Sequence, residues 1–291
     1  MHLSKGGYWG QAALCVLLSL ITLTTLYPFW HVLMYSFSDP KQAMGGGLFL
    51  LPKGFSLDSY RLLFVNSSIV QAYGNSLFRL LVGTLVNVVL TAMLAYPLSI
   101  RRYLFRTPIT LLIFFTMLFS GGMIPTYLLV NSFGLVNSLW ALIIPQAISA
   151  WNFFIMKNYF QSIPPELEES ANIDGASPMR TLIWIIIPVS MPVIAAIALF
   201  YGVHHWNAFF DAVLYIHDQE KQVLTIFLRS MMSYSAVEST RAMDSSAQMA
   251  NITEESVRMG AIVAAVIPML LIYPFLQKYY VKGVLIGSVK G

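Results

Sequence analysis

Cysteine and charged side chains are both scarce in this chain of 291 residues: it has one cysteine, and 10% of its residues are charged. A single cysteine cannot form an internal disulfide or a metal site built from several cysteines. Soluble domains carry about 25% charged residues, and 57% of this chain is hydrophobic, so the composition indicates an integral membrane protein. Cys15 lies inside the first long apolar segment, where we expect it to be packed.

The sequence also lacks a phosphate-binding loop of the form G-x-x-x-x-G-K-[ST], so it offers no such site for ATP hydrolysis. No acidic residue interrupts its long apolar segments, whereas gradient-driven carriers place ionisable groups there. Arg79 lies near the end of one segment, where we expect its side chain to reach the membrane interface.

The polar residues outside these segments give no sign of a catalytic or metal site. His204 and His205 are adjacent and point in different directions, so we expect them at the membrane interface rather than around a metal. The acidic residues that follow, Asp211, Asp218 and Glu220, are expected on a solvated face.

Six apolar segments are long enough to cross a membrane as helices: roughly 11–36, 72–99, 108–130, 138–160, 182–204 and 259–281. Backbone groups in lipid must bond within their own segment, so helices are expected. The sequence therefore predicts a single all-α transmembrane domain over residues 1–291, with outside loops at 38–70 and 205–258 and a cytoplasmic loop at 162–180. A short helix is expected near residues 223–232.

Basic residues set the expected orientation, because lysine and arginine concentrate on the cytoplasmic side. The connection after the second segment carries arginines and no acid, and both ends of the chain carry lysines. We therefore expect both termini in the cytoplasm, and we interpret the net charge of +4 as orientation charge rather than affinity for nucleic acid.

Residues 162–180, which we call the acidic segment, read as a helix, a sharp turn and a second helix. Prolines begin the first helix, acids fill its first turn, a glycine ends it and Ser-Pro begins the next: Pro164, Pro165, Glu166, Glu168, Glu169, Gly175, Ser177 and Pro178. A well-capped connection would explain the prolines and the glycine. It would not explain the apolar residues Leu167, Ala171 and Ile173, which fit docking into a groove on a basic partner.

Within the acidic segment, Glu169-Ser170-Ala171, Asp174-Gly175-Ala176 and Ile185-Ile186-Ile187-Pro188 resemble the EAA loop of binding-protein-dependent ABC importer permeases. Two positions depart from that pattern, because Ser170 replaces alanine and Ile187 replaces leucine. Over nearly the whole chain the sequence is similar to carbohydrate-uptake permeases of the maltose (MalG-like) type. The likeness to the maltose type lies in Trp206-Asn207 and in residues 287–291. Residues 120–127 and 273–278 look more like the LplC/YtcP branch, which includes alginate-oligosaccharide importer permeases.

The resemblance implies a type I ABC importer permease fold in the bacterial cytoplasmic membrane. Its implied partners are a second homologous permease, two ATP-binding subunits and an external solute-binding protein that delivers carbohydrate. It implies no cofactor, metal or catalytic residue in this chain, with ATP and Mg bound by the partner ATPase. Residues implied to couple to the ATPase are Glu166, Glu169, Ser170, Ala171, Asp174, Gly175, Ala176 and Pro188, with a contacting tail of Gly287, Ser288, Val289, Lys290 and Gly291.

A substrate path is the least defined feature of the sequence. Aromatic faces and amides suit sugars, and six residues within the apolar segments provide them: Asn87, Gln146, Trp151, Asn152, Trp206 and Asn207. The alternative is that the amides bridge neighbouring helices and the tryptophans lie at membrane interfaces. For the whole chain, the alternative functions are a secondary sugar transporter and a membrane scaffold that transports nothing.

Overall fold

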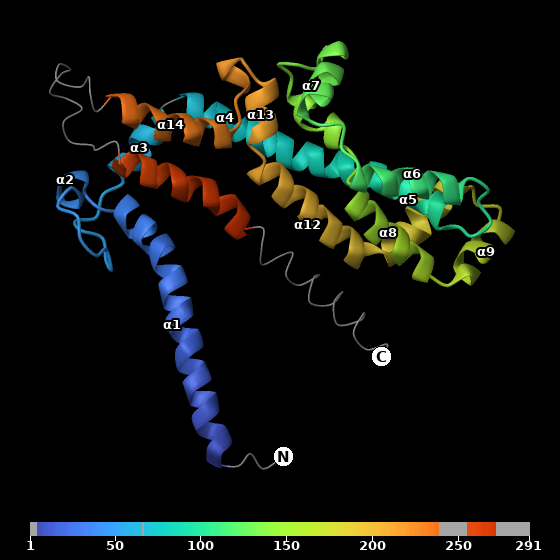
Figure 1. Cartoon of the computed structure of the whole chain (residues 1–291), viewed down its shortest axis with the longest axis horizontal. Coiled ribbons are helices and arrows are strands. Elements are labelled where there is room, and N and C mark those ends of the chain that lie inside the picture. Colours follow the sequence, from blue (N-terminus) through green and yellow to red (C-terminus); the bar gives the residue numbers. More distant parts are fainter. Residues whose placement is uncertain (1–4, 66, 239–254, 272–291) are drawn as a thin grey trace. The chain divides into compact units, whose positions relative to one another are not determined.

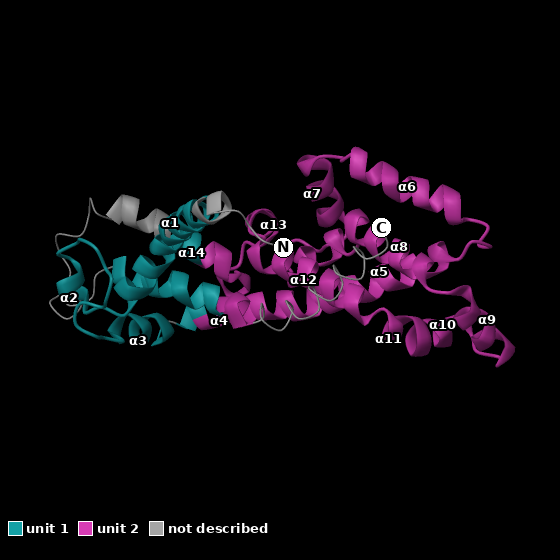
Figure 2. Cartoon of the chain, turned by 90° about the horizontal axis from the view of Figure 1, so that it is seen from below, with its two compact units in different colours: residues 1–69, 228–267 teal, residues 70–227, 268–291 magenta. Residues whose placement is uncertain are grey.

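The computed structural model describes residues 5–65, 67–238 and 255–271 (Figure 1). The described part is mostly helical and has no strand; one isolated bridge pairs Ser38 with Phe55. By contacts the chain divides into two compact units, unit 1 with residues 1–69 and 228–267 and unit 2 with residues 70–227 and 268–291 (Figure 2). The all-α class is therefore confirmed, while one transmembrane domain over residues 1–291 stays a prediction.

Unit 1 contains the long first helix, α1 (Lys5–Ser36), whose apolar stretch from Gly10 is not buried within the chain. Burial begins near His31, where the His31 and Tyr35 rings pack on Phe49. Cys15 lies on the exposed part of α1, so its expected packing is not found within this chain. The reason is that a single long helix contacts its own unit only near its C-terminal end.

The predicted outside loop 38–70 folds into short helices, α2 (Pro40–Ala43) and α3 (Asp58–Val65), before α4 (Ser67–Phe78) begins. Asp39 caps α2, since its carboxylate accepts hydrogen bonds from the Lys41 and Gln42 amides at 3.0 and 3.1 Å. Trp30 Nε1 donates to the carbonyl of Leu50 at 3.0 Å, which holds the loop against α1.

Unit 2 is built from helices that pack around α5, with α8 and α12 as its main neighbours (Figures 1 and 2). Its elements before the acidic segment are η1 (Arg79–Gly83), α5 (Thr84–Ser99), α6 (Arg106–Leu118), α7 (Met123–Ser132), η2 (Leu139–Leu142), η3 (Ile144–Gln146) and α8 (Ala150–Ser162). Those after it are η4 (Leu182–Ile186), α11 (Ile187–Val189), α12 (Met191–Asn207), α13 (Phe210–Tyr215) and η5 (Gln219–Lys221). The helix α14 (Leu224–Glu238) begins in unit 2 and belongs to unit 1 from Leu228 on.

The core of unit 2 is apolar and comes from α5, α8, η4 and α12. It contains Ala92, Ala95, Tyr96, Leu98, Phe153, Met156, Phe160, Leu182, Ile186, Val193, Ile197 and Tyr201. Because lipid is as apolar as this core, van der Waals packing rather than transfer out of water holds α5, α8 and α12 against one another. The short helix expected near residues 223–232 is found as α14.

Three of the predicted spans are not single straight helices. The predicted span 108–130 divides into α6 and α7 with a bend of 120°, and 138–160 bends by 52° before α8. The predicted span 182–204 bends by 87° between residues 178–189 and α12. Two other helices, Gly10–Ser36 and Ser67–Ser99, are each long and apolar enough to cross a membrane. Of the sixth predicted span, residues 259–281, the structure describes residues 259–271, which belong to a helix over residues 255–271. The span count stays a prediction.

Each bend has a local cause in the sequence. Gly122, the residue before α7 in the 120° pair, has a φ of +87°, a conformation that favours glycine and interrupts the helix. Ser149 caps α8 with its hydroxyl, which accepts from the Asn152 amide, so a new helix begins there. Ser190 lies between Pro188 and Pro192, and each proline removes a backbone donor from the helix.

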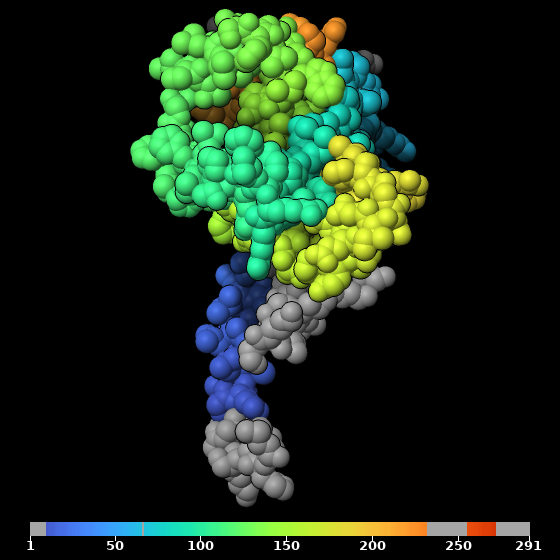
Figure 3. Space-filling view, turned by 90° about the vertical axis from the view of Figure 1, so that its right-hand side faces the viewer, coloured from blue at the N-terminus to red at the C-terminus, as the bar shows by residue number. Residues whose placement is uncertain are grey.

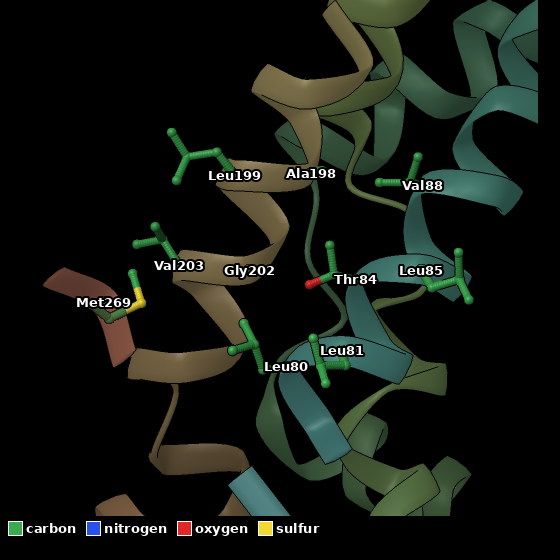
Figure 4. Close-up of a pocket in the computed structure, with 10 residues that line it drawn as sticks. All are labelled: Leu80, Leu81, Thr84, Leu85, Val88, Ala198, Leu199, Gly202, Val203 and Met269. Carbon is green, nitrogen blue, oxygen red and sulfur yellow. The ribbon is translucent and has the colours of Figure 1, made fainter. Parts of the chain in front are cut away.

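Two glycines let the η1–α5 helix and α12 approach closely. A Cβ on Gly83 would lie 2.6 Å from His205 Nε2, and a Cβ on Gly202 would lie 3.3 Å from Leu80 Cδ1. Beside Gly202 these helices border an apolar groove of about 340 Å³, which Figure 4 shows with Leu80, Thr84 and Leu199 at its walls. On one side, each glycine therefore makes room for a side chain of the other helix, and on the other side the helices leave a groove.

Gly83→Ala should destabilise this contact by about 1–3 kcal/mol, because the added methyl would overlap the His205 ring. Gly74→Ala is the matched control: it lies in α4 with open space around its Cβ position, so it should be neutral or stabilising by about 0.5–1 kcal/mol. Denaturant unfolding in detergent measures both. Equal stability of the two variants would contradict the close approach.

Candidate functional site

The acidic segment folds as its sequence predicts. Its first helix is α9 (Pro165–Ile173), with Pro164 at the cap and Glu166 and Glu168 in the first turn. Its second is α10 (Pro178–Thr181), which Ser177 caps by accepting from the Arg180 amide at 3.4 Å. Acids at the helix start favour α9, because the positive end of the helix dipole lies there.

The turn between α9 and α10 has a defined geometry around Gly175. The Ala176 amide donates to the Ala171 carbonyl at 2.9 Å, and the Gly175 amide donates to Asn172 at 3.1 Å. Together with a φ of +75° at Gly175, these bonds form a Schellman motif that satisfies the last carbonyls of the helix. The direction in which α10 leaves α9 is thus set by one glycine.

Most of the predicted coupling residues are exposed on the acidic segment: Glu166, Glu169, Ser170, Asp174, Gly175 and, on α11, Pro188. Ala171 differs, because its side chain is buried within the chain, and Ala176 is half-buried. The expected apolar surface of α9 therefore consists of Leu167 and Ile173, of which Ile173 is 86% exposed. In Figure 3 the acidic segment is the yellow part of the surface.

One contact of the acidic segment was not predicted. Arg102, in the connection between α5 and α6, lies with its Nη2 3.6 Å from Glu168 Oε1. Because Arg102 is largely exposed, such a pair contributes about 0–1 kcal/mol. The pair nevertheless brings α9 into contact with the arginine-rich connection between α5 and α6. From the sequence, these arginines were interpreted only as charges that set the orientation of the chain in the membrane.

A second polar region lies where the span before α8 is broken. Asn87 is fully buried on α5, and its Nδ2 lies 3.3 Å from the Gln146 carbonyl and 3.1 Å from His205 Nε2. Tyr201 on α12 accepts a hydrogen bond from the Ser149 amide at 2.9 Å. Side chains of α5 and α12 thus bond the backbone groups that the helix break frees.

Arg79 and the histidines lie elsewhere than the sequence predicted. Arg79 is 1% exposed and does not reach an interface, since it forms an ion pair with Asp211 and donates to the Ala208 carbonyl at 3.0 Å. Asp211 was expected to be solvated, but α13 turns it towards Arg79. His205 is buried against Asn87, whereas His204 is exposed and bonds the Gln146 side chain.

The acids further along remain outside this cluster. Lys221 Nζ lies 3.0 Å from Asp218 Oδ2, and hydrogen bonds from Lys221 and Asn137 lower the pKa of Asp218. Within the described part of the chain, no three His, Cys, Asp or Glu side chains gather closely enough to hold a metal ion.

An open cavity of about 450 Å³ lies beside this polar region, and we call it the break cavity. Its wall contains residues from the break before α7, from the end of η3, from α12 and from α13: Ser120, Gly122, Met123, Thr126, Gln146, His204, Ala208, Phe209, Phe210, Asp211, Leu214 and Tyr215. Figure 3 shows the surface hollowed below the green α7.

The six residues predicted for a substrate path separate into three groups. Gln146 lines the break cavity, and Asn87 lies behind it. Asn152 and Trp206 are buried within unit 2, and the Trp206 ring packs edge-on against Tyr73 at 5.9 Å. Trp151 and Asn207 are exposed and do not line the cavity. The signal missed in the sequence was the pair of helix breaks, which Gly121-Gly122 and Pro145 mark.

Comparison with known proteins places this architecture in one family. Residues 67–286 match the family described as binding-protein-dependent transport system inner membrane component. Over 277 residues the chain is 43% identical to the polygalacturonan/rhamnogalacturonan transport system permease protein YtcP of Bacillus subtilis, covering 94% of this chain and 96% of that protein. It is also 43% identical over 291 residues to protein LplC of the same organism, covering 100% and 98%.

A solved structure has the same fold. One chain of a bacterial ABC transporter involved in the import of the acidic polysaccharide alginate superposes with a TM-score of 0.87 at 28% identity, covering 96% of this chain and 99% of that one. The EAA-like pattern on α9 and α10, the broken apolar helices and these matches agree with one another. The chain therefore belongs to the family of binding-protein-dependent transport system inner membrane components, the permeases of ABC importers.

Proposed function

We propose that this chain is one of two permease subunits of an importer that carries an oligosaccharide, with acidic uronide chains as the favoured class. The observation that supports this cargo is its 43% identity over nearly the full chain to a permease named for polygalacturonan and rhamnogalacturonan transport. A structural relative involved in alginate import agrees with an acidic polymer. An external solute-binding protein delivers the saccharide to the outer side of the permease pair.

ATP hydrolysis takes place on two partner subunits, and the acidic segment is where their motion enters this chain. What supports this role is the exposed face of α9, with Glu166, Glu169, Leu167 and Ile173 available to a groove on another protein. The chain itself holds no ATP, Mg or other cofactor and catalyses no reaction. The predicted tail contact, residues 287–291, lies outside the described residues.

The proposed topology has six spans, both termini in the cytoplasm and a location in the bacterial cytoplasmic membrane. It is supported by the basic connection between α5 and α6, in which Arg101 and Arg102 lie beside Glu168 and Glu169 of the acidic segment. The bent helix pairs supply three of these spans.

Reconstitution of the complete transport complex tests this function. Vesicles that contain this chain alone should neither hydrolyse ATP nor accumulate trigalacturonate. With the second permease, the ATPase subunits and the loaded binding protein, ATP hydrolysis should rise and uptake should follow. Glu169→Lys should abolish the coupling, whereas Gln161→Lys, an exposed position on α8 before the acidic segment, should leave it intact.

Two results would contradict the proposal. Uptake by the purified chain alone under an ion gradient would indicate a secondary transporter. Assembly with the partners but no movement of any saccharide would indicate a scaffold.

A further inference from the structure

Two helix breaks open onto the break cavity. The break before α7 contributes Ser120 and Gly122, and the break before α8 contributes Gln146. Irregular backbone is tolerated within a membrane only where protein or a water-filled cavity covers it. Transporters place substrate at such discontinuous helices, because the interrupted backbone offers polar groups. The meeting of two breaks at one cavity therefore distinguishes it from the apolar groove of Figure 4.

The Gln146 side chain is held in place on this wall. Its Oε1 bonds His204 Nε2, while its backbone carbonyl accepts from the buried Asn87 amide at 3.3 Å. Asn87 in turn contacts His205, next to His204 on α12. A carboxamide fixed by its own backbone and by a histidine is a preorganised partner for hydroxyl groups.

The charges of the cavity favour an uncharged polar ligand surface. Asp211 lies on its wall, and Arg79 pairs with that carboxylate from a fully buried position. Among the described residues that line the cavity there is no lysine or arginine. Because Arg79 already neutralises Asp211, no free lysine or arginine on this wall could pair with a ligand carboxylate, and burying an unpaired carboxylate costs free energy.

The remaining wall matches the apolar and hydroxyl surfaces of a sugar ring. Phe209, Phe210 and Tyr215 provide aromatic surface, and Ser120 and Thr126 provide hydroxyls. Burial, with a smaller effect of Asp211, raises the pKa of Tyr215, so its phenol stays protonated. The volume of about 450 Å³ lies within the range of about 300–1,000 Å³ typical of small-molecule sites.

We propose that the break cavity is a saccharide subsite of the transport path that binds the hydroxyl face of a sugar ring through Gln146 and His204, and that it does not read the carboxylate of a uronide. This inference rests on the proposed carbohydrate function and deepens it. The acidic groups of the cargo are then recognised elsewhere in the importer, and this chain accepts the sugar backbone whether or not it is charged.

Cysteine protection tests the subsite in the assembled complex. With Cys15→Ser as the background, Ser120→Cys places a thiol in the cavity, and Ser132→Cys, exposed at the end of α7, is the matched control. Labelling by a membrane-impermeant maleimide is timed with trigalacturonate, with the neutral galactotriose, and without sugar. At a saccharide concentration about twice its Kd, mass action leaves about a third of the sites empty, so labelling should slow about threefold.

Both sugars should protect Ser120→Cys, and neither should protect Ser132→Cys. Adding Gln146→Leu should remove the protection, whereas Asn207→Leu, exposed outside the cavity, should keep it. If Ser120→Cys fails to assemble, Thr126→Cys takes its place.

Three outcomes would contradict either the subsite itself or the proposal that it does not recognise the carboxylate. Absence of protection in a complex that still imports trigalacturonate would show that the cavity is not on the path. Protection by trigalacturonate alone would show that the carboxylate is read here. A wild-type complex that imports neither sugar would refute the carbohydrate function first, and the subsite with it.

Discussion

Arg79→Met should destabilise the chain by about 3–5 kcal/mol, because it leaves the Asp211 carboxylate beside α12 without its ion-pair partner. Arg79 is 1% exposed, and it also donates to the Ala208 carbonyl at 3.0 Å. Removing one partner of a buried pair costs more than removing both, since the remaining charge stays desolvated. The free energy of unfolding of the purified complex in detergent, measured by denaturant titration, checks this value.

The double variant Arg79→Met/Asp211→Leu separates the pair from its surroundings. Replacing both charges by apolar groups should recover most of the lost stability. Lys221→Met serves as the surface control: it breaks a pair with Asp218 whose side chains are 44% and 51% exposed, so its effect should stay within about 1 kcal/mol. An Arg79→Met variant no less stable than Lys221→Met would show that the buried pair does not hold α13 in place.

The second large effect is expected at the turn of the acidic segment. Gly175→Val should reduce coupled uptake by about 5–30-fold, since a φ of +75° costs an L-residue about 1–2 kcal/mol. Nothing lies within 4 Å of the Cβ position, so the effect comes from the backbone rather than from a clash. Uptake of trigalacturonate, normalised to the amount of assembled complex, measures it.

Gly175→Asn is the matched control, because asparagine adopts the left-handed conformation more readily than other residues. It should keep most of the uptake, while Gly175→Val should lose it with the ATP hydrolysis of the partners uncoupled from transport. Equal uptake by the two variants would mean that the direction of α10 does not matter for coupling.

The acidic segment was predictable from the sequence because local signals determine it. Its prolines, its glycine and Ser177 act within four residues of where they stand, so helix ends and turn follow from the chain alone. The burial of Ala171 could not be predicted in the same way. Ala171 is buried because its side of α9 packs against the rest of the chain, and which side does so depends on the tertiary fold.

The broken spans show the limit of hydropathy. Residues 108–130 and 138–160 are predominantly apolar, so a window average gives one span for each and overlooks the bends. The local causes were visible in Gly121-Gly122 and Pro145, but glycine and proline are tolerated in straight transmembrane helices as well. Whether such a residue breaks a helix is decided by neighbours that bond the freed backbone, here Asn87 and Tyr201.

The Arg79–Asp211 pair was beyond sequence reasoning for a related reason. The two residues are 132 positions apart. Taken alone, Arg79 fits an arginine at the membrane interface and Asp211 fits a solvated aspartate. Only the structure, in which α13 places Asp211 beside Arg79 of η1, shows that each charge is largely removed from solvent because the other neutralises it. A charged residue near the end of an apolar segment should therefore be considered together with acids in every outside loop.

The bend at Ser190 has a mechanical consequence. Residues 178–189 meet α12 at 87°, so a displacement along the first helix has almost no component along the axis of the second. In the proposed coupling, a displacement of α10 by the partner ATPase is therefore expected to move α12 mainly across its own axis. Because Gly83 lies against the His205 ring and Gly202 against the Leu80 side chain, we expect η1 and the start of α5 to move with α12. We expect the same motion to alter the wall of the break cavity, because His204 on this wall lies near the C-terminal end of α12, far from the bend at Ser190.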